Sequence, residues 1–177
     1  MCRFFREQDG TAIVVVSAVE AMDAAIEAGA DAFDEWVHDL LHAVEGAQAS
    51  RVVIDSLMDL QMAAADDTRF REFMYSLAQR FSRQGISLLI TYETPDLFST
   101  GRLSQFAVSH LADNAIALNY HRDHSAMSRS LAIFKTRASN HDPAMRQFSI
   151  GPDSISLQDT AIPGASVNHG PGANHWG

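Results

Sequence analysis

Two carboxylates that could hold a metal ion follow apolar runs in this sequence. Asp55 comes directly after the run 52–54 and is followed by Ser56, and Glu93 lies at the end of the run 86–93. The carboxyl ends of parallel strands meet at the edge where α/β proteins bind ligands. Carboxylate oxygens suit Mg²⁺. The pattern therefore predicts a site for Mg²⁺ or an activated water, with a turn-capping role for Asp55 as the alternative.

Two cations, Lys135 and Arg137, lie two positions apart in a segment predicted to be a strand. Side chains at this spacing point to the same face of a strand. Phosphate oxygens are the usual ligand of such a pair, because arginine can engage them through two hydrogen bonds. The alternative is a solvated strand end at which both cations pair with acids.

No phosphate-binding loop accompanies these cations. The chain contains 13 lysines and arginines, and Lys135 is the only lysine among them. A loop of the form G-x-x-x-x-G-K-[ST] needs a lysine directly after its second glycine, whereas Lys135 follows Phe134. The 177 residues therefore contain no such loop.

Buried strands and amphipathic helices alternate in the first half of the sequence. Apolar runs over residues 11–17, 51–55 and 86–93 predict strands covered on both faces, as in a parallel sheet. Apolar residues at helical spacing predict one helix over about residues 31–45 and a second helix before the last of these strands. Strand, helix and strand in this order predict a right-handed parallel crossover.

Local signals mark the ends of these helices. Gly46 is expected to cap the first helix, and Asp66 or Asp67 is expected to begin the second, which stops at Gly85. Residues 56–65, between the 51–55 strand and the second helix, predict a loop. Five residues of the second helix are expected to face the core: Phe70, Phe73, Met74, Leu77 and Phe81.

Shorter elements fill the second half of the sequence. A short helix over residues 102–110 is followed by predicted strands 114–120 and 129–137, which a polar turn joins into an antiparallel hairpin. Two further strands are expected over residues 146–150 and 154–157. The remainder is rich in Gly, Pro, Asn and His. The sequence thus predicts one α/β domain over residues 1–158 and a disordered tail over residues 159–177.

The composition excludes several classes of protein. An apolar content of 46% and a charged content of 20% are typical of a globular chain, and the net charge of −9 argues against a nucleic-acid surface. Cys2 is the only cysteine, so no internal disulfide can form. No signal-peptide pattern and no apolar run of membrane-spanning length is present, which predicts a cytoplasmic protein.

Four motifs resemble the KaiC-type ATPases, a family of circadian clock proteins in the RecA-like branch of the P-loop NTPase superfamily. Residues 135–142, K-T-R-A-S-N-H-D, resemble the family's K-x-R-x-[TS]-x-H signature. The run R-V-V-I-D-S at 51–56 resembles its Walker B strand, residues 91–93 the end of its next strand, and residues 111–114 the entry to its hairpin. The resemblance covers residues 10–158, roughly the later two-thirds of the family's domain. It implies a RecA-like, mostly parallel sheet flanked by helices, with a C-terminal antiparallel hairpin.

The resemblance also implies an ATP site at a subunit boundary. In KaiC-like hexamers the signature lysine and arginine reach the nucleotide of the neighbouring subunit, so Lys135 and Arg137 match trans phosphate ligands. Asp55 matches a residue that holds Mg²⁺ through water. ATP and Mg²⁺ are the implied cofactors, and the implied partner is a ring of copies or a complete KaiC-like ATPase. The other matched nucleotide-binding positions are Ser56, Arg129, Thr136, Ser139 and His141.

The chain also departs from the family's pattern. The phosphate-loop strand and the strand with paired catalytic glutamates would precede Gly10, so an incomplete core and no ATP hydrolysis by this polypeptide alone are expected. Gly151 and Pro152 replace a Thr-Asp pair that some members place near the nucleotide. The strand over residues 86–92 is expected to lack a neighbour, which favours a truncated reading frame or a partner that supplies the missing strand.

Two functional hypotheses remain. In the first, the chain is a segment of an ATP-binding ring; in the second, it is a non-catalytic regulatory module that docks onto a complete RecA-like ATPase through its hairpin. The acidic charge argues against a third, DNA-directed role. His38 and His42 approach an H-E-x-x-H metal pattern, but aspartate replaces the glutamate, and a solvated helix face is the preferred interpretation.

Overall fold

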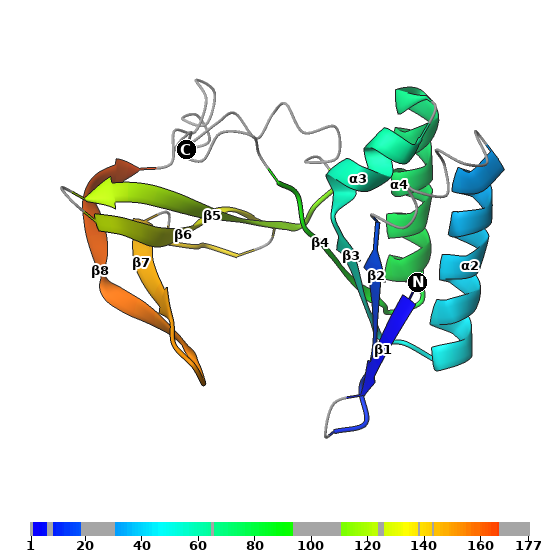
Figure 1. Ribbon diagram of the computed structural model, residues 1–177, viewed down its shortest axis with the longest axis horizontal. Helices are drawn as coiled ribbons and strands as arrows, with labels where there is room; N and C mark the ends of the chain where they lie inside the picture. The colour runs from blue at the N-terminus through cyan, green and yellow to red at the C-terminus, as the bar shows by residue number, and fades with distance from the viewer. Residues whose placement is uncertain are drawn as a thin grey trace. The chain divides into compact units, whose positions relative to one another are not determined.

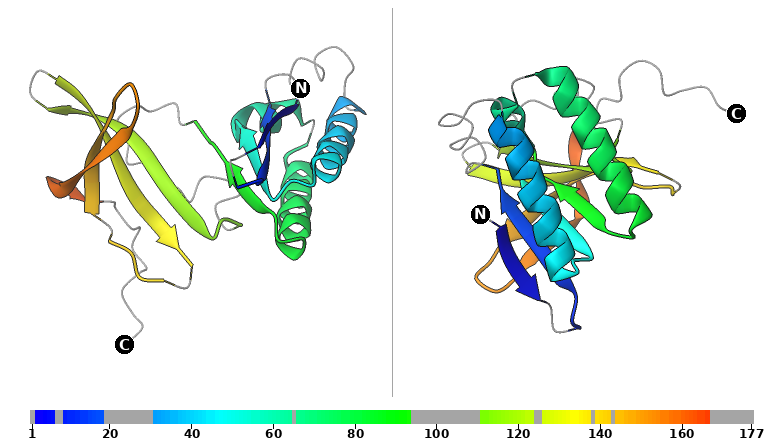
Figure 2. Two further views of the ribbon diagram at one scale, coloured as in Figure 1. Left: turned by 90° about the horizontal axis from the view of Figure 1, so that it is seen from below. Right: turned by 90° about the vertical axis from the view of Figure 1, so that its right-hand side faces the viewer.

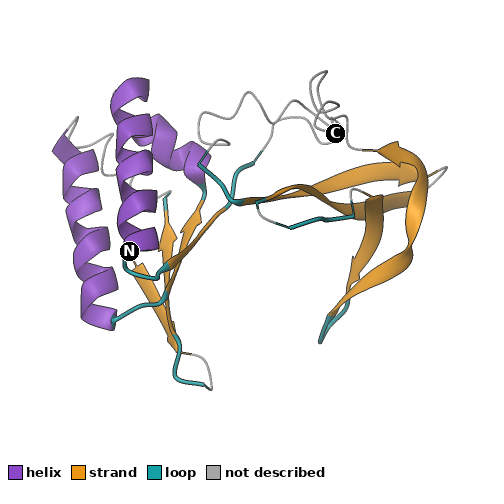
Figure 3. Ribbon diagram, turned by 180° about the vertical axis from the view of Figure 1, so that it is seen from behind, coloured by secondary structure: helices purple, strands orange, loops and turns teal. Residues whose placement is uncertain are grey.

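The chain forms two compact units, Met1–Glu93 and Thr94–Gly177, and each contains a four-stranded sheet (Figure 1). Helices accompany only the first sheet within the described part of the chain (Figure 3). Parallel strands with helices and a C-terminal antiparallel hairpin confirm the predicted α/β class. This computed structural model describes residues 2–6, 9–18, 31–64, 66–93, 111–123, 126–137, 139–142 and 144–166.

The first sheet has the strand order β1-β2-β3-β4. Strands β2 (Ala12–Ser17), β3 (Arg51–Asp55) and β4 (Ser87–Ile90) run parallel, as predicted. An unpredicted strand, β1 (Cys2–Arg6), pairs antiparallel with β2. Its sequence carries no alternating pattern, so pairing with β2, rather than local propensity, accounts for it.

Two long helices cover one face of this sheet. Helices α2 (Asp31–Ala47) and α4 (Asp67–Arg83) lie side by side across the strands (Figure 2) and are joined by an ion pair between Glu45 and Arg80 at 2.6 Å. Between helices and sheet lies an apolar core. Its fully buried members include Val14, Val16, Val52, Ile54, Leu40, Phe70, Met74 and Phe81. Four of the five predicted core residues of α4 are buried, and Phe73 is only half-buried.

The opposite face of the sheet is less well covered. Val15 and Val53 are half-buried, and Leu89 of β4 is 61% exposed. The predicted burial of these strands on both faces is therefore met on one face only. Within the described residues this agrees with the expected incomplete core.

A helix replaces one predicted loop. Residues 56–65 were expected to be irregular, but α3 (Leu57–Ala63) forms there, and its Leu57 and Leu60 are buried. Burial of two residues at helical spacing stabilises this helix of about two turns, because seven residues alone are too few to form a stable helix in water. The helix follows directly on the tip of β3.

The helix ends follow the expected chemistry with one correction. Asp66 accepts a hydrogen bond from the Arg69 N–H at 2.8 Å and is the predicted cap of α4. Gly85 ends that helix with φ +71°, where glycine carries no steric cost. Gly46 does not end α2, because the helix continues to Ala47 and Gln48 adopts the left-handed conformation with φ 49°.

The second sheet is antiparallel throughout, in the order β5-β6-β7-β8. The predicted hairpin is confirmed as β5 (Asn114–Asp123) and β6 (Ala126–Thr136), with longer strands and a shorter turn than expected. β7 (Ala144–Ile150) and β8 (Ile155–Ser166) complete the sheet. β8 continues past residue 158, where the tail was expected to begin; the limits of the domain stay a prediction.

A small apolar cluster lies on one face of this sheet. Ala132 and Met145 are buried there, with Phe134 and Ile162 packed against them. The other predicted features of this half, a helix over residues 102–110 and the tail beyond residue 166, lie outside the described residues. None of the described helices is long and apolar enough to cross a membrane.

Candidate functional site

The carboxyl ends of three parallel strands meet at one edge of the first sheet, as predicted. Ser17 of β2 lies opposite Asp55 of β3. The Ala18 N–H donates to the Asp55 carbonyl oxygen at 2.8 Å, and the Thr91 N–H donates to the Ile54 carbonyl oxygen at 3.0 Å. Backbone hydrogen bonds therefore hold the ends of β2, β3 and β4 in register around Asp55.

The Asp55 side chain is exposed and makes a contact across to the next strand. Its Oδ1 accepts a short hydrogen bond from the Thr91 hydroxyl, and the peptide bond that follows it, to Ser56, is cis. This cross-strand contact differs from the turn cap that the alternative interpretation predicts. An ionised carboxylate offers about four acceptor positions, so Asp55 can still accept from water. A single exposed carboxylate at a strand end fits Mg²⁺, which usually keeps several of its waters.

Ser56 is engaged within the chain. Its side chain is 5% exposed, and its hydroxyl donates to Asp59 Oδ2 of α3 at 2.6 Å. Glu93 is exposed beyond the end of β4. Within the described part of the chain, no three histidine, cysteine or acidic side chains gather as a metal cluster. The metal role of Asp55 and the nucleotide role of Ser56 remain predictions.

Two of the predicted cations, Arg129 and Lys135, lie well apart along β6. Arg129 lies across from Tyr120, with its guanidinium carbon 5.6 Å from the ring centroid, a cation–π contact. Lys135 lies six residues further along, opposite Ala115. At about 3.4 Å per residue the two cations are about 20 Å apart along the strand. They cannot bind the same phosphate.

Arg137 lies just past the end of β6. Its N–H donates to the Asp113 carbonyl oxygen at 2.8 Å, and its guanidinium pairs with the Asp113 carboxylate at 2.9 Å. Both side chains are 64% exposed. This is the surface ion pair that the alternative interpretation predicts for Arg137. The pairing of β5 with β6 is irregular near Ala115, and β6 ends at Thr136. Arg137 therefore lies outside the regular strand, and the alternation of side chains along a strand does not fix its direction relative to Lys135.

The rest of the signature leads into β7. Ser139 is exposed, and the Nε2 atom of His141 is buried with no hydrogen-bond partner among the described residues. Asp142 accepts from Arg146 Nη2 at 2.7 Å and from the Ala144 N–H at 2.9 Å. These two hydrogen bonds, the Arg146 contact first, hold the pKa of Asp142 below its usual 3.8.

Sequence reasoning missed the partners of the site residues. Thr91 contacts Asp55, Asp113 contacts Arg137, and Arg146 contacts Asp142. Thr91 and Asp113 lie in motifs that the sequence identifies, but their contacts are not predicted by it. Asp113 lies in the segment that resembles the family's hairpin entry, which was a usable signal. For Arg146 the sequence carried no signal, because its role depends on the pairing of β7 with β8.

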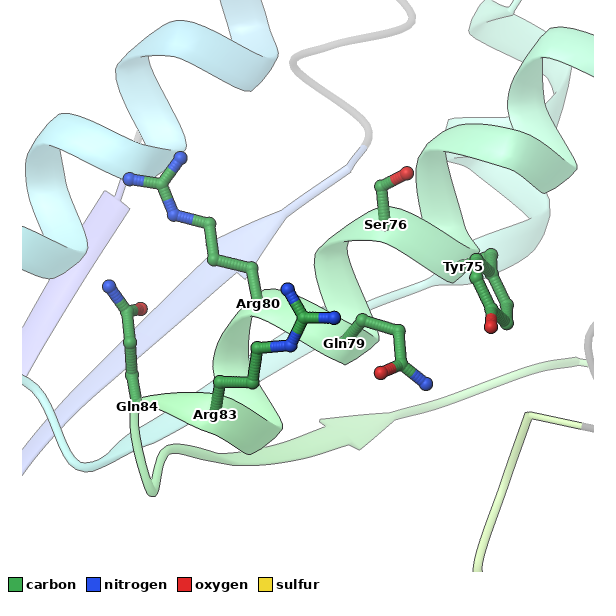
Figure 4. A pocket seen from close by; sticks show the side chains of 6 residues that line it. All are labelled: Tyr75, Ser76, Gln79, Arg80, Arg83 and Gln84. Carbon is green, nitrogen blue, oxygen red and sulfur yellow. The ribbon is translucent and has the colours of Figure 1, made fainter.

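A shallow pocket of about 570 Å³ lies elsewhere, on the outer side of α4. Figure 4 shows its lining side chains, all of which belong to that helix or the residue after it. Arg80 in this pocket is already paired with Glu45. None of the predicted site residues lines it, and one helix face cannot enclose a ligand, so the pocket is not the functional site. The lining residues are Tyr75, Ser76, Gln79, Arg80, Arg83 and Gln84.

Comparison with known proteins decides the family. The family described as "ATPase: KaiC" matches residues 5–161, which include both strand ends and the whole signature segment. The chain belongs to the KaiC ATPase family. A KaiC-like protein of Pyrococcus horikoshii shares its fold with a TM-score of 0.60 and 24% identity, over 71% of this chain and 54% of that one.

Curated KaiC proteins are similar over a shorter stretch. Circadian clock protein KaiC3 of Synechocystis is 32% identical over 107 residues, 60% of this chain and 21% of that protein. The circadian clock oscillator protein KaiC of Synechococcus elongatus is 31% identical over 111 residues, 63% of this chain and 21% of that protein. The chain therefore matches about a fifth of the length of these KaiC relatives.

Proposed function

We propose that this chain supplies one side of a KaiC-type ATP site, whose nucleotide is held mainly by another subunit. Membership of the family supports ATP and Mg²⁺ as the ligands. The observation that carries the proposal is the exposed position of the Arg137 guanidinium at the base of the hairpin, held by one equally exposed carboxylate. The residues proposed to reach the nucleotide are Lys135, Thr136, Arg137, Ser139 and His141.

Each residue has a distinct task in this proposal. Asp55, at the strand ends of the first unit, would hold Mg²⁺ through water, and this ion would neutralise charge on the phosphates of a nucleotide at that edge. The trans residues belong to the second unit and would serve the nucleotide of another subunit. Lys135 and Arg137 stabilise negative charge that grows on the terminal phosphate, and they act only when the subunits are assembled. Arg129 lies about 20 Å away along β6, so it binds another part of the same nucleotide or a neighbouring subunit. Ser56 supports this edge through Asp59 of α3.

The proposed partner is a ring of copies or a complete KaiC-like ATPase, in the cytoplasm. The 177 residues contain no glycine-rich phosphate loop, so we expect no ATP hydrolysis by this polypeptide alone. The same observation favours the second candidate function. In that function the chain regulates a complete KaiC-like ATPase in trans, without taking part in the chemistry.

Reconstitution with a complete KaiC-family ATPase tests the proposal. Arg137→Ala is expected to lower turnover more than MgATP affinity, because its contact strengthens as charge develops on the phosphate. Arg83→Ala, on α4 in the other unit, is the control and should change neither quantity. Equal turnover with Arg137→Ala and the control would refute the trans role. If the wild-type chain alters the turnover of the complete ATPase and the Arg137→Ala chain alters it equally, the regulatory function is favoured.

The isolated chain provides a second test. We expect the wild-type chain to hydrolyse ATP no faster than a Lys135→Ala variant, which gives the background rate. A wild-type rate clearly above that background would contradict the requirement for another subunit.

A further inference from the structure

Arg146 of β7 joins the signature segment to two strands. Its Nη2 donates to Asp142 Oδ2 at 2.7 Å, and its Nη1 donates to the Asp159 carbonyl oxygen of β8 at 2.5 Å. Asp142 also accepts from the Ala144 N–H at 2.9 Å. The Arg146 side chain is 30% exposed, so this pair is less accessible to water than the Arg137–Asp113 pair. One planar guanidinium thus spans β7, β8 and the last residue of the signature.

His141 directly precedes Asp142 in the sequence and is the last residue of the K-x-R-x-[TS]-x-H match. Its Nε2 atom is buried and has no partner among the described residues. A buried polar atom without a hydrogen bond costs free energy, because it has lost its water. A ligand that bonds to Nε2 would remove this cost.

We propose that Arg146 is a positioning residue for nucleotide binding: by fixing Asp142 against β8, it orients the neighbouring His141, whose buried Nε2, unpartnered among the described residues, gains a partner in the bound nucleotide. This inference rests on the proposed function, because it takes the ligand of His141 to be the nucleotide. The lowered pKa of Asp142 agrees with it, since the carboxylate stays ionised and paired. Lysine carries its donors on a single nitrogen, so it would not reproduce the two separate nitrogens that Arg146 directs at Asp142 and at the Asp159 carbonyl oxygen.

The test is nuclear magnetic resonance of the full chain together with a complete KaiC-family ATPase, with MgATP as the probe, following the His141 ring signals and the Asp142 carboxyl. Arg146→Gln is expected to move the His141 signals, to raise the Asp142 pKa toward 3.8 and to weaken MgATP binding about two- to fivefold. Arg146→Lys should restore part of each effect. Arg83→Gln, the matched control on α4, should change none of them. Asp142→Asn, which removes the same ion pair from the other side, should move His141 as Arg146→Gln does.

The possible outcomes distinguish a failure of the positioning role of Arg146 from a failure of the proposed function. Unchanged His141 and Asp142 signals in Arg146→Gln would overturn the positioning role. Shifted signals with unaltered MgATP affinity would overturn it as well, since the contact would then be structural only. If MgATP moves no signal of the wild-type chain even in the presence of a complete KaiC-family ATPase, the proposed function fails, whatever the variants do to His141.

Discussion

Binding of a phosphate to Arg137 requires that its guanidinium exchange one anion for another. The Asp113 carboxylate, 2.9 Å away, occupies it in this structure. Coulomb's law gives about 1.4 kcal/mol for two unit charges at that distance in water. Both side chains are 64% exposed, so screening and side-chain entropy reduce this to about 0.5 kcal/mol. Removal of the Asp113 charge should therefore tighten phosphate binding about two- to threefold.

Calorimetric titration of the full chain with inorganic tripolyphosphate measures this effect. Asp113→Asn should bind more tightly than wild type at low salt, and the difference should shrink as salt screens the exposed charges. Asp153→Asn, which removes a charge from the β7–β8 loop, is the control and should show no such gain. In an Arg137→Ala background, Asp113→Asn should have lost its effect. Affinity that is equal or weaker in Asp113→Asn at low salt would refute the competition between carboxylate and phosphate.

Three further predictions concern stability. Phe81, only 1% exposed, leaves a cavity when replaced, so Phe81→Ala should lower the free energy of unfolding by about 3–5 kcal/mol in urea; a loss below 1 kcal/mol would contradict its core position. Asp66→Ala removes the acceptor for the Arg69 N–H and should cost about 1 kcal/mol in thermal unfolding, whereas Asp66→Asn keeps that acceptor and should cost less; equal costs would count against the cap. The Thr11 N–H lowers the pKa of Asp9, so the stability it contributes is present above about pH 4 and is lost as pH falls through the lowered pKa. Asp9→Asn should flatten that acid dependence, and an unchanged pH profile of unfolding would refute it.

The parts of the fold that the sequence predicts are those with strong local signals. β3 is a run of β-branched residues, and α4 has a capping aspartate, apolar residues at helical spacing and a terminal glycine. α3 was missed because its signal spans only seven residues and depends on burial against the rest of the unit. The predicted last strand is shorter than β8, because the residues beyond it are rich in Gly, Pro, Asn and His, which are typical of a disordered tail; β8 is an edge strand, and edge strands tolerate proline.

In the candidate site, too, the sequence predicts what has a local signal and misses what depends on strand pairing. Residue types and spacing identified Asp55, Lys135 and Arg137, because carboxylates at strand ends and paired cations are visible in a sequence. Their partners were not visible. The contact of Arg137 with Asp113 depends on how β5 pairs with β6, and the link between Arg146 and β8 depends on two registers that carry no local signal.

The exposed Leu89 has a practical consequence for handling this protein. β4 ends the strand order of the described sheet, and it contains serine, leucine and isoleucine but no charged residue to repel another strand. A host cell that produces the chain by itself is expected to deposit much of it in inclusion bodies or to keep it bound to chaperones. Co-expression with a complete KaiC-family ATPase is therefore the better route to purified material, and a Leu89→Lys variant is the better choice for work on the chain in isolation.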